Sequence, residues 1–242
     1  MLLRRVMGHV KDQNWLAVGI DFLIVVSGVF IGLQVSEWND NRNSREAYQL
    51  ARERLVAESE ANLDAVDAFL AGKETTLPLV RSSIDVLRRC AAAPEDLVRF
   101  EAGLNIIRGT PTLRLRHSAI ESLTSNEAFL AQQSETERNR LDELRRRLTQ
   151  AQDTLNWLET WPFDSPIEDH PAIGFGDLTQ SENMPGIADR RLTLSVPLAE
   201  ACQDQRLAKH FYLWERVALF QSIRAGQVKT WMEANISMMS TG

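Results

Sequence analysis

An almost wholly apolar run near the N-terminus, IDFLIVVSGVFIGLQ (residues 20–34), constrains this 242-residue chain more than any other feature. Trp15 and Trp38 bracket the run and would lie about 34 Å apart on an α-helix. That length matches a hydrocarbon core of about 30 Å with one tryptophan at each interface. The residues that follow, LQVSEWNDN, lack the small-x-small site of a cleaved signal peptide. The sequence therefore predicts one uncleaved transmembrane helix over residues 15–38.

Residues 1–14, MLLRRVMGHVKDQN, precede this helix and are predicted to form an amphipathic segment in the membrane interface. One helical face carries the apolar side chains Leu2, Leu3, Val6, Met7 and Val10. The basic side chains Arg4, Arg5 and Lys11 lie elsewhere around the helix. Four arginines follow the span, so the positive-inside count is nearly even. The basic residues before the span are more closely spaced than those after it, which favours a cytoplasmic N-terminus and a periplasmic C-terminal domain.

One face of the predicted span combines Asp21 with Gly28 and Gly32, which lie within about 20° of the aspartate on a helical wheel. Ser36 lies near the same face. A G-x-x-x-G pair lets a neighbouring helix approach closely, and a carboxylate at membrane depth is costly unless it faces water or a partner. The pattern indicates a helix-packing face with a membrane-embedded polar residue.

Three interpretations of Asp21 remain open at this point. The side chain reaches the headgroups or water; or it belongs to a face that mediates homo-oligomerisation or binds another membrane protein; or it carries protons or ions in an accessory subunit of an ion-coupled or transport complex. An Asp21→Asn change distinguishes the last from the others, because only a titrating group has to lose and regain a proton.

The block DFLIVVSGVFIGLQVSEWN (residues 21–39), behind a short basic start, resembles the opening of an uncharacterised family of bacterial single-pass membrane proteins. Members of that family carry an N-terminal anchor and a helical domain of unknown function. The resemblance covers roughly residues 1–60. It implies a bacterial inner-membrane location with a single pass, and it implies no activity.

Residues 39–242 are predicted to form a helical extramembrane domain. A helix over residues 39–72, which the anchor helix runs into, has one face formed by Tyr48, Ala51, Leu55, Ser59, Asn62, Val66 and Phe69. A second helix over residues 75–93 points Leu79, Ile84 and Leu87 inward. A third helix starts at Pro94 and stops at Gly109. Two short helices follow over 110–125 and 124–133, with Thr124 and Glu127 as a capping box.

The helix that follows a second capping box, Ser134 and Glu137, has the clearest apolar periodicity in the chain. Its seam alternates by three and four residues and consists of Leu141, Leu144, Leu148, Ala151, Leu155 and Leu158. Packing within the domain is favoured over a separate coiled-coil dimer. The last helix, about residues 205–238, has an apolar face of Leu207, Phe211, Trp214, Val217, Phe220 or Gln221, Val228 and Trp231.

Residues 161–200 hold five of the eight prolines and are predicted to form a long irregular loop. Its polar cluster is interpreted as a solvated acidic surface and not as a metal site; the members are Asp164, Glu168, Asp169, His170 and Asp177. Cys90 and Cys202 are interpreted as two separate buried residues. A single bridge is the alternative if the domain lies outside the cytosol.

Composition and motifs narrow the function classes. The formal charge of −6 and the absence of a basic stripe argue against nucleic-acid binding. The chain has no P-loop, dinucleotide-binding, zinc-protease or nucleophile-elbow motif, so no catalytic residue, cofactor or metal is predicted. The sequence predicts a mainly α protein, with one N-terminal transmembrane helix and a helical-bundle domain. Its predicted role is structural or interactive, with the lipid bilayer and a membrane partner or second copy as partners.

Overall fold

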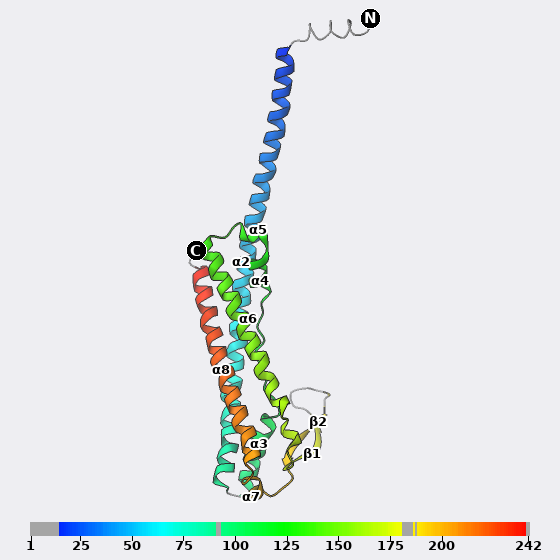
Figure 1. Ribbon diagram of the computed structural model, residues 1–242, viewed down its shortest axis with the longest axis vertical. Helices are drawn as coiled ribbons and strands as arrows, with labels where there is room; N and C mark the ends of the chain where they lie inside the picture. The colour runs from blue at the N-terminus through cyan, green and yellow to red at the C-terminus, as the bar shows by residue number, and fades with distance from the viewer. Residues whose placement is uncertain (1–14, 91–92, 181–185, 187, 241–242) are drawn as a thin grey trace.

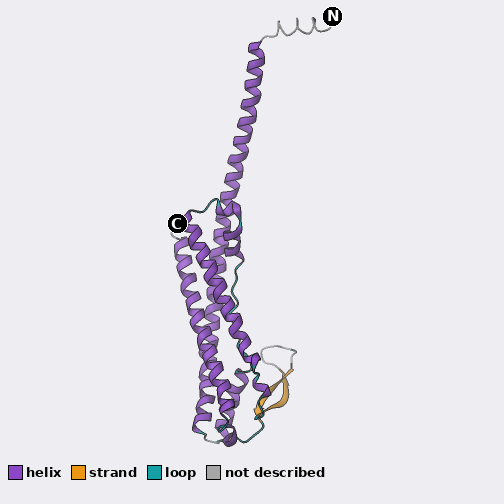
Figure 2. Cartoon of the chain, in the orientation of Figure 1, coloured by secondary structure: helices purple, strands orange, loops and turns teal. Residues whose placement is uncertain are grey.

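The computed structural model describes residues 15–90, 93–180, 186 and 188–240, and it is mainly α. Figure 1 and Figure 2 show a long helix, α2, whose first part projects beyond a helical bundle, with a small hairpin at the opposite end. The elements are α2 Trp15–Arg89, α3 Pro94–Ile106, α4 Ser118–Ser125, α5 Glu127–Leu130, α6 Glu135–Asp164, η1 Ile167–Asp169, β1 Ile173–Gln180, β2 Ala188–Leu194, α7 Leu198–Ala201 and α8 Gln205–Ser240.

Helix α2 is one unbroken element of 75 residues, so the prediction of separate helices over 39–72 and 75–93 is wrong. The helix continues past Pro78, which removes one backbone hydrogen bond at a cost of about 3 kcal/mol. Its buried face continues on both sides of the proline, through Val66, Lys73 and Val80. Packing of that face offsets the cost. Leu79, predicted to point inward, is 43% exposed.

The bundle is built from α2, α6 and α8, with α3 beside the far end of α2 (Figure 1). Helix α8 runs along α2 and ends at the same end of the bundle from which α2 emerges (Figure 1). The inward face predicted for the start of α2 is confirmed from Tyr48 to Val66, and Tyr48 is its first buried residue. The sequence left open whether Phe220 or Gln221 lies on the inward face of α8. Gln221 is buried there, whereas Phe220 is 52% exposed.

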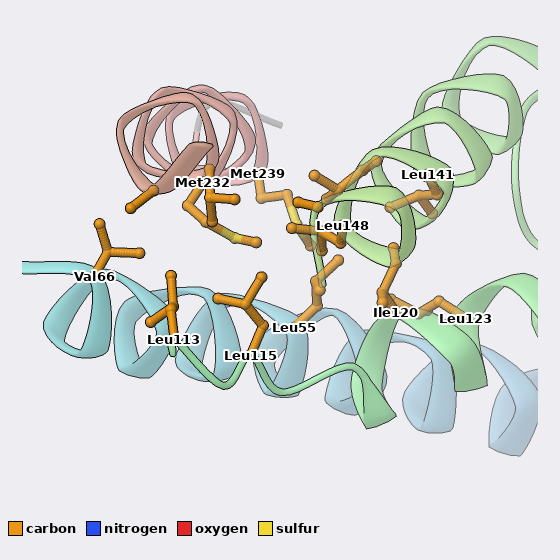
Figure 3. Close-up of a cluster of buried hydrophobic side chains, with 14 of the residues drawn as sticks. Leu55, Val66, Leu113, Leu115, Ile120, Leu123, Leu141, Leu148, Met232 and Met239 are labelled. Carbon is orange, nitrogen blue, oxygen red and sulfur yellow. The ribbon is translucent and has the colours of Figure 1, made fainter. Parts of the chain in front are cut away.

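Two clusters of buried apolar side chains fill the bundle. The near cluster lies where α2 enters the bundle and joins α2, α4, α6 and the second half of α8; it includes Leu55, Leu148 and Met232 (Figure 3). The far cluster joins the end of α2 to α3, the hairpin and the first half of α8, and includes Phe100 and Phe211. The six seam residues of α6 are all buried, five of them in the near cluster, so this seam packs within the domain.

The segment between α3 and α4 differs from its prediction. A helix was expected over residues 110–125, but residues 109–117 have no regular structure and the helix begins only at Ser118. Two amide side chains replace the missing helical hydrogen bonds. Asn62 on α2 accepts from the Arg116 N–H at 2.8 Å and donates to the Arg116 carbonyl at 3.0 Å. Gln152 on α6 makes the same pair of contacts to Leu115 and Leu113, at 2.8 and 3.1 Å.

The two predicted capping boxes have different outcomes. The side chain of Ser134 accepts from the Glu137 N–H at 3.2 Å and caps α6 as predicted. The Thr124–Glu127 box is wrong. The side chain of Asn126 caps α5 by accepting from the Ala128 N–H, while the Thr124 hydroxyl donates to a carbonyl one turn earlier within α4.

The long irregular loop predicted over residues 161–200 is also wrong. It contains the last turn of α6, the short helices η1 and α7, and the antiparallel hairpin of β1 and β2, which pairs Ile173 with Leu194 and Gln180 with Ala188. Tertiary contacts hold this hairpin. The side-chain amide of Asn105 on α3 accepts from the Leu192 N–H at 2.8 Å and donates to its carbonyl at 3.0 Å.

The polar cluster in this region is not simply a solvated surface. Arg108, in the turn after α3, binds Glu168 at 3.2 Å and Asp189 at 2.7 Å, and it thereby ties η1 and β2 to the bundle. These contacts raise the pKa of Arg108, chiefly through Asp189. His170 is buried. In the part of the chain that the structure describes, no three His, Cys, Asp or Glu side chains are grouped as metal ligands.

Cys90 and Cys202 form a disulfide, so the preferred interpretation of two separate buried cysteines is wrong. Their Cα atoms are 5.5 Å apart, within the usual range for a bridge, and Cys90 is exposed. The bridge joins the residue after α2 to the residue after α7, 112 positions later. A loop of this length makes the expected stabilisation about 2–5 kcal/mol.

Helices α2 and α3 lie very close together at Gly103. A Cβ atom there would clash with the Ser83 hydroxyl and lie 3.1 Å from the Leu79 carbonyl oxygen. The Ser83 hydroxyl is itself held between the two helices, because it contacts the Arg99 carbonyl at 3.0 Å and the Leu79 carbonyl at 3.2 Å. The contact therefore has little freedom to relax.

We expect Gly103→Ala to lower the free energy of unfolding by about 1–3 kcal/mol, because α3 must move away from α2. Urea unfolding followed by circular dichroism measures it. Gly226→Ala on α8 is the matched control: a Cβ there meets nothing within 4 Å, and alanine should stabilise the helix by about 0.5–1 kcal/mol. Equal effects from the two changes would contradict the close approach.

Candidate functional site

The first candidate site is the anchor segment, residues 15–38 of α2. From Phe22 to Asn43 every side chain is exposed, and the apolar ones include Phe22 at 70%, Phe30 at 60% and Leu33 at 64%. The stretch is long and apolar enough to cross a membrane, and none of its most apolar window is buried within the protein. A core helix of a soluble protein would be mostly buried. Continuous apolar exposure of this kind marks a surface that contacts lipid or another protein.

The predicted helix-packing residues lie on this exposed segment. Gly28, Gly32 and Ser36 follow one another at four-residue spacing on α2, so they lie along one side of the helix. A Cβ atom at either glycine would meet nothing within 4 Å. The two glycines therefore leave this side of the helix without side-chain bulk, between large apolar side chains on the rest of the segment.

The structure describes only some of the other residues that were predicted to act in the anchor. Trp38 is 65% exposed, 10 positions before the first buried residue of the bundle, Tyr48. Trp15 and Asp21 are on α2, but their side chains lie outside the described part of the structure. The basic residues Arg4, Arg5 and Lys11 and the predicted amphipathic segment 1–14 also lie outside the described residues.

The second candidate site was not predicted, and it surrounds Lys73 at the junction of the two core clusters. Lys73 is only 5% exposed. Its ammonium donates to the Gln221 side-chain oxygen at 2.8 Å and to the Pro111 carbonyl at 3.5 Å. It also lies 5.0 Å from the ring centre of Phe69 and 5.3 Å from that of Trp214. These neighbours are neutral, so the buried positive charge is stabilised only by dipoles and ring faces.

Burial of this ammonium lowers the pKa of Lys73 from 10.5 to about 8. Removal from water disfavours the charged form of a lysine, and a nearby carboxylate would normally restore it. Among the described residues no carboxylate lies within 4 Å of the Lys73 nitrogen. At neutral pH the lysine is still mainly protonated, so the bundle holds a charge without a counter-ion.

A sequence signal for Lys73 does exist. The inward face predicted on α2 ends at Phe69, and its spacing of three and four places position 73 next on the same face. That face is apolar or uncharged up to this point, and Lys73 is its first cation. Lys73 was missed because one helix was predicted to end at Gly72 and another to start after it, so the inward face was not followed to position 73.

His170 and His210 form a third polar contact, at the far end of the bundle. Their rings are 5.9 Å apart, and His170 Nε2 lies 3.4 Å from an oxygen of Asp204. The backbone N–H of Ala172 donates to His170 Nδ1, which places the ring proton on Nε2, toward Asp204. Burial, aided by His170, lowers the pKa of His210. These contacts attach η1 to the start of α8 and serve a structural role.

The stability of a Lys73→Met variant should depend on pH differently from that of the native protein. Below pH 8 the lysine is charged in the folded and unfolded states, so its burial costs the full penalty. Between pH 8 and 10.5 the unfolded chain binds the proton more tightly, so the free energy of unfolding of the native protein rises with pH relative to the variant. The difference between the two free energies of unfolding, called the gap below, should shift by about 1–3 kcal/mol in favour of the native protein.

Urea unfolding at pH 7, 8.5 and 10.5 measures this gap. Lys229→Met is the control, because Lys229 pairs with Asp67 at 2.7 Å and that pairing raises its pKa. Its gap to the native protein should stay flat over the same range. A flat gap for Lys73→Met as well would show that the Lys73 ammonium is not buried.

Comparison of the chain with protein-family models, curated proteins and solved structures finds no match. The family resemblance of residues 21–39 therefore stays a prediction, and the function has to be argued from the anchor segment and the bundle.

Proposed function

We propose that this is a single-pass membrane protein with a structural or interaction role, and that the glycine side of its anchor segment binds a second copy or another membrane protein. The anchor would hold the helical bundle beside the bilayer. The observation that carries the proposal is the unbroken helix α2, which is apolar and unpacked from Phe22 to Trp38 and buried on one face from Tyr48 onward.

Continuity of α2 supports a permanent anchor over a removed signal sequence. The helix passes from the apolar segment into the bundle without a break, and cleavage after the apolar run would remove the start of an element that carries part of the core. The 10 positions between Trp38 and Tyr48 span about 15 Å on a helix, so the bundle would begin close to the membrane surface.

The disulfide supports a periplasmic location for the bundle in a bacterial inner membrane. Disulfides form and persist in oxidising compartments and are rare in the cytosol. The Cys90–Cys202 bridge at the far end of the bundle thus favours the same orientation as the dense basic charge at the N-terminus. With an even count of flanking charges, the bridge is the stronger of the two arguments.

The small residues Gly28 and Gly32, which have open space around them, support association through the anchor. Lipid chains are as apolar as leucine, so helices associate in a bilayer through close packing, and small residues at four-residue spacing allow the backbones to approach. The opposite side of the helix carries the bulky residues Val26 and Phe30, which suit lipid contact.

Single cysteines at positions 28 and 32 test this face. In native membranes, Gly28→Cys and Gly32→Cys should form disulfide-linked dimers on mild oxidation, whereas Val26→Cys and Phe30→Cys on the opposite side should form several-fold fewer. Non-reducing gels measure the yield. The native cysteines are already paired with each other, so the introduced thiol is the reactive one and the stabilising bridge can be kept.

Equal crosslinking at all four positions would contradict a specific self-associating face. Absence of dimers at all four would rule out a second copy as the partner on this side. Photocrosslinking from position 28 to a distinct membrane protein would then be the remaining support for the interaction role.

Orientation is tested by labelling with a membrane-impermeant maleimide. A Thr149→Cys variant places an exposed thiol on α6, and it should be labelled in intact spheroplasts if the bundle is periplasmic. His9→Cys, in the N-terminal segment, is the matched control and should be labelled only after the membrane is permeabilised. The reverse pattern would place the bundle in the cytoplasm and would contradict the proposed location.

A further inference from the structure

The bundle has a cleft beside Lys73 that neither its packing nor the anchor requires. It measures about 380 Å³ and is lined from four parts of the chain: Phe69 and Lys73 on α2, Ile106 at the end of α3, Pro111 in the extended segment, and Trp214 on α8. Small-molecule sites usually measure roughly 300–1,000 Å³ and combine apolar walls with a few polar groups. This cleft has that composition, with one cation among mostly apolar neighbours.

The walls of the cleft are fixed before any ligand arrives. The indole N–H of Trp214 donates to the Gly109 carbonyl at 2.8 Å, which holds the ring in place. The Thr76 hydroxyl donates to the Gly72 carbonyl at 2.9 Å within α2, so its proton is already used. The remaining donor with a full charge is the Lys73 ammonium.

Lys73 is incompletely satisfied by its protein neighbours. An ammonium has three N–H donors, and two of them contact the Gln221 side chain and the Pro111 carbonyl. No carboxylate among the described residues neutralises the charge. The Gln221 amide nitrogen, which is also buried, has no hydrogen-bond partner in the described part of the chain. The junction of the two core clusters therefore lacks an acceptor and a negative charge.

We propose that this cleft binds a monocarboxylate with an apolar body, of the class of medium-chain fatty acids. The carboxylate would pair with the Lys73 ammonium, and the hydrocarbon would lie against the rings of Phe69 and Trp214. A cation is excluded by the lysine charge. A phosphate or sulfate is disfavoured because it needs several donors, and the cleft offers one. The volume, at the lower end of the range, favours a chain of about ten carbons over a long-chain acid.

The ligand would come from the aqueous compartment and not from the bilayer. Lys73 lies 35 positions beyond Trp38 on the same helix, about 50 Å from the proposed membrane interface. An acyl chain of a membrane lipid does not extend that far. A free carboxylate dissolved in the compartment that surrounds the bundle is therefore the expected source.

The test uses the full chain in lipid nanodiscs, titrated with sodium decanoate by isothermal calorimetry at pH 7. Three variants in identical nanodiscs cancel the partitioning of decanoate into lipid. Lys73→Met should weaken binding at least tenfold. Gly72→Leu should weaken it equally while keeping the ammonium, because Gly72 lines the cleft and a Cβ there meets nothing within 4 Å. Gly226→Leu, also open but outside the cleft, should bind as the native protein does.

Two further titrations test whether binding needs the negative charge of the ligand and the positive charge of Lys73. Decanol, which has the same chain without the charge, should bind at least tenfold more weakly than decanoate. Decanoate affinity should fall about twofold from pH 7 to 8 and then more steeply, approaching tenfold per unit above pH 8, as the free protein loses the Lys73 proton.

Equal binding of decanol, binding of inorganic phosphate in place of decanoate, or the same heat from Gly72→Leu as from the native protein would each overturn the proposal. None of these outcomes depends on whether the anchor segment self-associates, so the ligand site and the proposed function are tested separately.

Discussion

The rest of the structure depends on one constraint: a single helix, α2, has to satisfy two environments without interruption. From Phe22 to Trp38 its side chains are mostly apolar and are exposed all around the helix; from Tyr48 onward one face is buried in the bundle. A helix can do this because its backbone hydrogen bonds are internal, so its backbone polar groups are paired in either environment except where Pro78 removes one bond. The bundle is thus attached to the anchor by a rigid element, and α8 returns to the end from which α2 emerges (Figure 1).

Amide side chains, one buried and two half-buried, then decide the path of the less regular chain segments. Asn62 and Gln152 hold the extended segment between α3 and α4, and Asn105 holds β2. In each case one amide pairs with a backbone N–H and with a backbone carbonyl. Such a side chain replaces the partners that a helix or a wider sheet would supply, and it makes the irregular route as well satisfied as a regular one.

Lys73 shows a different use of a buried polar group. It lies between the near and far clusters, where α2, α8 and the extended segment leave a cleft instead of a close-packed core. A charge in that position costs stability unless it is paired, and the neutral neighbours pair it only in part. A binding site gives a physical reason for keeping it, because the missing counter-charge is what a carboxylate ligand would provide.

The local patterns of the sequence were sufficient where periodicity and composition dominate. The helical form of residues 15–38, the inward face from Tyr48 to Val66, the seam of α6 from Leu141 to Leu158 and the Ser134 cap depend on residues a few positions apart, and the helical class follows from them. The position of Gly28 and Gly32 on one side of this helix follows from their spacing of one turn, whereas binding of a partner there stays a prediction.

Tertiary structure decided the features that join distant segments. The passage of α2 through Pro78 requires packing on both sides of the proline. The hairpin requires the contact of Asn105 on α3 and the contact of Arg108 in the turn after α3. The disulfide requires the ends of α2 and α7 to meet, and the Lys73 cleft requires walls from four segments. The sequence by itself determined which residues form helices and which faces are apolar, because those are local preferences. Only the folded chain decided which polar residues meet across the bundle, because hydrogen bonds and charge burial depend on neighbours that are far away in sequence.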